Sequence, residues 1–140
     1  MSLDTINSPW AARALGLLRI VTAWLFLQHG TAKLFGVPMA MGGPHELQLF
    51  SLIGLAAVLE AFGGVLVLIG LFTRPVAFVL SGEMAVAYFK AHASMATVFT
   101  PLLNHGESAI MFCFVFLLLA AAGSGAWSVD AFRAAKANRT

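Results

Sequence analysis

Residues 47–72 read LQLFSLIGLAAVLEAFGGVLVLIGLF, an apolar segment in which Glu60 is the only charged residue. As an α-helix this segment would extend for about 39 Å, enough to cross the ~30 Å hydrocarbon core of a bilayer. It lacks the alternation of apolar and polar residues that is typical of membrane β-strands. Small residues recur along it every three or four positions: Gly54, Ala57, Ala61 and Gly64. The segment therefore predicts a membrane-spanning helix that packs closely against another helix.

Three further apolar segments flank this one, at residues 12–35, 76–93 and 107–122. Glycine and proline separate them, because these residues end helices or form turns. The chain of 140 residues is 60% hydrophobic and 10% charged, and its mean hydropathy is +0.89. These values are typical of membrane proteins. We expect residues 1–140 to form one all-α domain, an integral membrane four-helix bundle with short loops and a short amphipathic helix at the C-terminus.

The distribution of basic residues predicts the orientation of the bundle. Four spans place both chain ends and the turn at Arg74 on one side. That side carries most of the basic residues: Arg13, Arg74, Arg133, Lys136 and Arg139. The other side has only Lys33 and Lys90, so the positive-inside rule places both termini in the cytoplasm. The N-terminal segment contains Asp4 and no basic stretch, so we expect it to be a retained helix and not a cleaved signal peptide.

Composition excludes several classes of function. No run of Lys and Arg indicates a nucleic-acid partner. Cys113 is the only cysteine, so an internal disulfide and a CxxC redox pair are ruled out. The chain also has no covalent haem-attachment motif and no flavin or nicotinamide fingerprint. The sequence thus predicts the lipid bilayer as a partner and no nucleic acid.

Ionisable residues inside apolar segments are the main candidates for a functional site, because each is costly to bury in a membrane. We expect Arg19, Glu60 and Glu83 to lie at a similar depth and to form one intramembrane network. An arginine between two carboxylates satisfies several of its donors and leaves one negative charge, which a proton would neutralise. This network has two interpretations: a structural lock between helices, or a proton site or polar pocket.

A second polar layer is expected at the opposite end of the bundle. Its members are His29, Lys33, Lys90, His92 and His105. Such a layer could hold a metal, contact haem or bind the headgroup of a quinone. The histidines have neither HxxxH nor HxxH spacing, so no metal site is predicted. Asn104 and Glu107 match a helix-capping box, a structural role that involves no chemistry.

The order of these features resembles the DoxX family of small bacterial membrane proteins with four helices. The matching pieces are Arg19; QHG at 28–30 with KLFG at 33–36; EAFGG at 60–64 with LIGLFTR at 68–74; Glu83-Met84 with Ala87; Asn104 with Glu107; and GSG at 123–125 with SVD at 128–130. Together they cover nearly the whole chain. The resemblance implies a multi-pass protein of the bacterial cytoplasmic (inner) membrane.

The resemblance also implies a function. Some members of the family look like subunits of thiosulfate:quinone oxidoreductases, and others are linked to oxidative-stress complexes. We therefore expect a membrane subunit of a quinone-linked oxidoreductase, with quinone as the cofactor and further subunits or a second copy of the chain as partners. Two alternatives remain open. One is an accessory or assembly subunit without chemistry of its own, and the other is a small proton or solute pathway through Glu60, Glu83 and Arg19.

Overall fold

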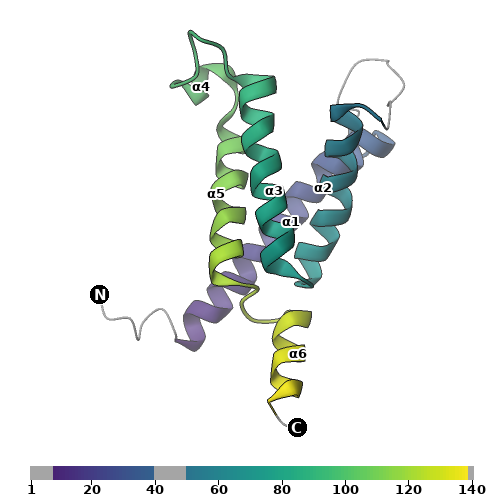
Figure 1. The fold of residues 1–140 in the computed structure, drawn as a ribbon, viewed down its shortest axis with the longest axis vertical. Coiled ribbons are helices and arrows are strands. Elements are labelled where there is room, and N and C mark those ends of the chain that lie inside the picture. Colours follow the sequence, from purple (N-terminus) through teal and green to yellow (C-terminus); the bar gives the residue numbers. More distant parts are fainter. Residues whose placement is uncertain (1–7, 40–49, 139–140) are drawn as a thin grey trace.

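The computed structural model describes residues 8–39 and 50–138, and within them the chain is all-helical, with six α-helices and no strand. The helices are α1 (Pro9–Phe35), α2 (Leu52–Ile69), α3 (Thr73–Ala87), α4 (Pro101–Asn104), α5 (Glu107–Ala122) and α6 (Val129–Ala137). A π-helical segment, Tyr88–His92, continues α3. Figure 1 shows α4 at one end of the molecule, and α6 with the start of α1 at the other.

The ends of α1 and α2 lie at serine and glycine residues. Ser8 and Ser51 cap α1 and α2, because each hydroxyl accepts a hydrogen bond from a backbone N–H three residues later. Gly36 and Gly70 end the same helices in the left-handed conformation, with φ of 69° at both. The predicted segment 107–122 coincides with α5. In place of the predicted segment 47–72 the structure has the shorter helix α2, Leu52–Ile69. Residues 47–49 of the predicted segment lie outside the described residues.

Two pairs of helices make up the body of the molecule. α1 packs along α2, and α3 packs along α5 (Figure 1), while contacts of α2 with α3 and of α1 with α5 join the pairs. At Gly30, α1 approaches the backbone of α2 closely. A Cβ atom there would lie 2.6 Å from the backbone nitrogen of Ala61. This contact sets which residues of α1 and α2 face one another.

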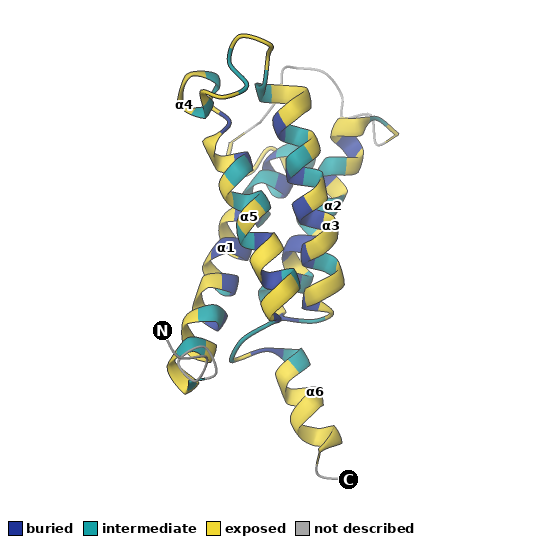
Figure 2. Cartoon of the chain, turned by 60° about the vertical axis from the view of Figure 1, so that its left-hand side comes forward, coloured by how far each residue is buried: buried dark blue, intermediate teal, exposed yellow. Residues whose placement is uncertain are grey.

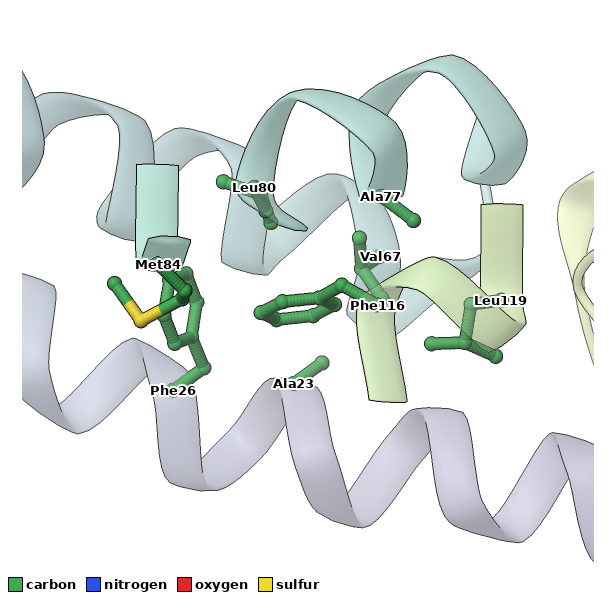
Figure 3. Packing of buried hydrophobic residues seen from close by; sticks show 8 residues of the cluster. All are labelled: Ala23, Phe26, Val67, Ala77, Leu80, Met84, Phe116 and Leu119. Atoms are coloured by element: carbon green, nitrogen blue, oxygen red, sulfur yellow. The ribbon is translucent and has the colours of Figure 1, made fainter. Parts of the chain in front are cut away.

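The core lies where these helices meet. Figure 3 shows Phe116 of α5 at its centre, beside Phe26 and Ala23 of α1 and Val67 of α2. The rings of Phe26 and Phe116 pack edge to face, with centroids 4.8 Å apart, a favoured aromatic geometry. These side chains are fully buried. They hold both helix pairs together without any polar group.

Apolar side chains also cover the outside of the helices. Figure 2 shows long exposed stretches on the outer faces of α1, α2, α3 and α5. Large exposed residues there include Trp24, Phe62, Phe78 and Phe114. By length and composition, α1 and α2 could each cross a membrane, and α5 is a shorter apolar helix. Exposed apolar surface on this scale calls for a non-aqueous environment.

Candidate ligand-binding site between α2 and α3

An ion pair between α1 and α2 lies beside the candidate site. The Nζ atom of Lys33 lies 2.5 Å from Oε1 of Glu60. The Glu60 side chain is 2% exposed and that of Lys33 is 21% exposed. Gly30 lies one helical turn before Lys33 and packs on the backbone of Glu60 and Ala61. The close helix approach at Gly30 therefore brings the ammonium group to the carboxylate.

Three carboxyl oxygens beside this pair have no hydrogen-bond partner among the described residues. They are Oε2 of Glu60 and both oxygens of Glu83, and all three are buried. Glu83 lies near enough to Glu60 and Lys33 to interact with both charges. Buried polar atoms are normally satisfied, so unpaired ones indicate a missing ligand, water or proton. Two carboxyls and one ammonium are electrically neutral when one carboxyl is protonated.

A cavity of about 600 Å³ lies next to Glu83, within the size range of small-molecule sites. Lys33, Glu83 and Lys90 supply the charged groups of its lining. The rest of the lining is apolar and comes from α2, α3 and the end of the π-helical segment: Leu52, Ile53, Leu55, Ala56, Leu59, Val79, Gly82, Val86, Ala87 and Ala91. A Cβ atom at Gly82 would have no neighbour within 4 Å. This glycine therefore leaves space that a larger residue would fill.

Arg19 does not join the two glutamates, which corrects the expected network. Glu60 pairs with Lys33, a position about 21 Å further along α1 than Arg19. The depth prediction failed because Glu60, in the middle of α2, meets the last part of α1 where Gly30 packs on Glu60 and Ala61. Arg19 belongs to the opposite end of the molecule.

There, the guanidinium of Arg19 is bound by backbone carbonyls. It is fully buried. Nε donates to Ser124 at 2.8 Å, Nη1 to Val67 at 2.8 Å and to Leu68, and Nη2 to Ala126 at 3.2 Å and Trp127 at 2.8 Å. These bonds use all five donors of the side chain. Two acceptors are end carbonyls of α2, which carry the negative end of the helix dipole. Arg19 thus ties the segment after α5 to the end of α2.

Asp130 completes this junction. Its carboxylate accepts hydrogen bonds from the backbone N–H groups of Phe72 at 3.0 Å and Thr73 at 2.8 Å, at the start of α3. Partial burial by itself would raise the pKa of Asp130, but the Thr73 and Phe72 hydrogen bonds and the charge of Arg133 outweigh it. The pKa of Asp130 therefore lies below its ordinary value of 3.8.

We expect Asp130→Ala to lower the free energy of unfolding by about 1 kcal/mol at pH 7, a typical loss for a helix cap. The pKa of Asp130 is lower in the folded state, so the stabilisation is complete above the unfolded pKa and is lost as pH falls through the folded value. Thermal unfolding of wild type and variant in detergent, at pH 7 and at pH 3, measures this. An equal difference at both pH values would contradict a role for the ionised carboxylate.

The five residues predicted for the opposite polar layer do not share one pocket. Lys33 and Lys90 line the cavity, whereas the histidines do not. The Nδ1 atom of His29 lies 3.2 Å from the carbonyl oxygen of Leu25. The Nδ1 atom of His92 lies 3.2 Å from the carbonyl oxygen of Asn104. His105 is the C-cap residue directly after α4 and has a φ of 56°. Across the described residues, no three His, Cys, Asp or Glu side chains are placed to hold a metal.

The predicted capping box at Asn104 and Glu107 is wrong. Gly106 precedes α5, and Glu107 is its first residue. Asn104 is instead the last residue of α4, and its side chain organises the loop. Its amide nitrogen donates to Tyr88 Oη at 3.1 Å and to the Thr97 carbonyl at 2.9 Å, and its oxygen accepts from the Gly106 N–H at 2.8 Å. Because Asn104 belongs to α4, it cannot cap α5, and Gly106 takes the N-cap position.

Three functional features escaped the sequence interpretation. The partner of Glu60 was sought in Arg19, although Gly30 three residues before Lys33 was a signal for close packing at that level. Asp130 follows Ser128 at the start of an amphipathic helix, and nothing local connects it to α3. Gly82, in the middle of a helix next to Glu83, was a signal for a cavity or close approach.

Comparison with known proteins places this arrangement in a family. The family profile described as DoxX matches residues 14–93, which include most of α1, all of α2, and Lys33, Glu60 and Glu83. A protein of Haemophilus influenzae, described as uncharacterized, is 42% identical over 117 residues, which cover 83% of this chain and 87% of that protein. No solved structure gives a significant match. The chain therefore belongs to the DoxX family, and this membership, together with the apolar helices α1 and α2, indicates a membrane protein.

Proposed function

We propose that this protein is the membrane subunit of a quinone-linked oxidoreductase and that a quinone binds in the cavity between α2 and α3. One observation carries the proposal: an apolar cavity of about 600 Å³ ends at the charged groups Lys33 and Glu83. A quinone likewise has an apolar part and a polar part: an apolar chain is attached to a ring that forms hydrogen bonds. Apolar walls with a few polar groups are typical of such sites.

In this proposal four helical segments cross the bacterial cytoplasmic membrane. They are α1, α2, α5 and the continuous helix formed by α3 and its π-helical end. Residues 73–92 of that continuous helix extend for about 30 Å, the thickness of the hydrocarbon core. Both termini then lie in the cytoplasm, because Arg13, Arg74 and Arg133 are at that end. The cavity then falls in the outer half of the membrane. Leu52 at the start of α2 and Lys90 at the π-helical end of α3 both line it, and these helix ends lie opposite the turn at Arg74.

The charged and the apolar lining residues then have different roles in binding. Lys33 and Glu83 bind the ring of the quinone, and Lys90 lies at the mouth of the cavity. The apolar side chains of Leu52, Val79 and Val86, all exposed on the outer faces of α2 and α3, accommodate the chain of the ligand and lead to the lipid. The subunit binds and orients the quinone, and electrons come from a partner protein that oxidises a reduced sulfur compound.

Filling the cavity tests this proposal. We expect Gly82→Leu to weaken binding of decyl-benzoquinone at least tenfold, because its side chain occupies space that is open in the wild type. Gly82→Ala is the matched control, since it adds only a Cβ atom at the same position. Isothermal titration of both variants in lipid nanodiscs gives the affinities, and circular dichroism verifies that both fold. Wild-type protein that binds no quinone, yet recovers stoichiometric partners from membranes, would support the accessory-subunit alternative.

A further inference from the structure

The unpaired polar atoms of the site are hydrogen-bond acceptors. Both oxygens of Glu83 and Oε2 of Glu60 are buried without a partner among the described residues. The nearby donor, Lys33, donates to Glu60 at 2.5 Å but makes no hydrogen bond to either oxygen of Glu83. Lys90, the other cation of the lining, is exposed, so water can satisfy its ammonium group. What the oxygens of Glu83 lack is therefore a donor.

Protonation of Glu83 does not change this need. An ionised carboxyl has two acceptor oxygens, and a protonated one has an O–H donor together with remaining acceptor capacity. In both states at least one oxygen of Glu83 needs a donor from the ligand. An unsatisfied buried acceptor is expensive, since each costs about 1–3 kcal/mol.

The two redox forms of a quinone differ in this respect. The oxidised ring has carbonyl groups, which only accept hydrogen bonds. The reduced ring has hydroxyl groups, which both donate and accept. A hydroxyl can therefore pair with Glu83 in either protonation state, whereas a carbonyl always leaves an acceptor of Glu83 unpaired.

We infer that the site binds the hydroquinone in preference to the quinone, and that Glu83 is the residue that determines this selectivity. The inference rests on the proposed function and adds the redox form of the ligand to it. A site of this kind holds the product of quinone reduction. Its selectivity makes reduction of the bound ring more favourable than reduction of the same ring in the lipid.

Paired titrations of the two redox forms test the inference. Decyl-benzoquinone and its hydroquinone are titrated anaerobically into wild-type protein in nanodiscs. We expect the hydroquinone to bind about tenfold more tightly. In Glu83→Leu the ratio should fall to about one, because no acceptor is left to satisfy. Glu107→Gln serves as the control for loss of a glutamate outside the cavity and should keep the wild-type ratio.

The outcomes separate the two proposals. Equal affinities in wild type would overturn the selectivity and leave quinone binding intact, whereas no binding of either form would overturn both. A ratio that Glu83→Leu does not change would remove Glu83 from the role. Glu83→Gln provides a second test, since its amide oxygen still needs a donor and should keep a preference for the hydroquinone; a ratio of about one in this variant would overturn the role of the acceptor. A redox titration gives an independent value, because a tenfold preference raises the midpoint potential of the bound couple by about 30 mV.

Discussion

Replacing Arg19 by lysine should lower the free energy of unfolding by about 3 kcal/mol or more, although the charge is conserved. The guanidinium donates five hydrogen bonds to carbonyls from two separate segments. An ammonium group has three donors on a flexible stem and cannot reach the same acceptors. Several carbonyls would then be buried without a donor, and each hydrogen bond to a charged group contributes about 1.5–3 kcal/mol.

Reversible unfolding of the detergent-solubilised protein in sodium dodecyl sulfate measures this loss. Limited proteolysis between α5 and α6 adds a local readout, because Arg19 holds residues 124–127. Arg13→Lys is the matched control: Arg13 lies on the same helix, is exposed and packs over the ring of Trp10. We expect that change to alter stability by less than about 0.5 kcal/mol. Comparable effects of the two substitutions would contradict the role assigned to the backbone carbonyls that bind Arg19.

Removing the ammonium of Lys33 should also be costly, with a loss of about 3 kcal/mol for Lys33→Met. Glu60 would then be left as a buried carboxyl without the one ion-pair partner that it has among the described residues, and breaking a buried pair from one side typically costs about 3–5 kcal/mol. The reverse change, Glu60→Met, should cost less. The Lys33 side chain is partly exposed, and its ammonium group can extend toward lipid headgroups or water.

The double variant Lys33→Met/Glu60→Met is the decisive measurement. With both charges removed, neither position leaves a buried charge without its counterion, so we expect stability to return to near the wild-type value. The same dodecyl sulfate titration applied to all four proteins closes a double-mutant cycle. If the losses of the two single variants simply add in the double variant, Lys33 and Glu60 are not coupled across α1 and α2.

The boundaries of the helices were largely predictable because local residues determine them. Gly123 stops α5 where the apolar segment ends, and Gly36 and Gly70 supply the left-handed conformation that ends α1 and α2. The start of α2 and the cap of α5 were less accurate. Ser51 marks the start of α2 locally but lies inside the predicted apolar segment. The residues before α5 form the separate short helix α4, which ends at Asn104.

The partners of the buried charges were not predictable in the same way. Arg19 was matched with carboxylates because opposite charges attract, yet its partners are carbonyls, some from a segment more than 100 residues later. Backbone carbonyls occur at every position, so no sequence pattern marks them. The pairing of Lys33 with Glu60 depends on where α1 crosses α2, which the contact of Gly30 with Ala61 sets.

The amino-acid sequence by itself determined the all-helical class, the apolar segments, the glycines that separate them, and which ionisable residues lie inside them. These properties depend on composition and on neighbours along the chain. Tertiary structure alone decided that Arg19 locks the C-terminal segment, that Lys33 pairs with Glu60, and that Lys33 and Glu83 border a cavity. Helix crossing points determine which side chains meet, and a small change in register moves each side chain to another partner.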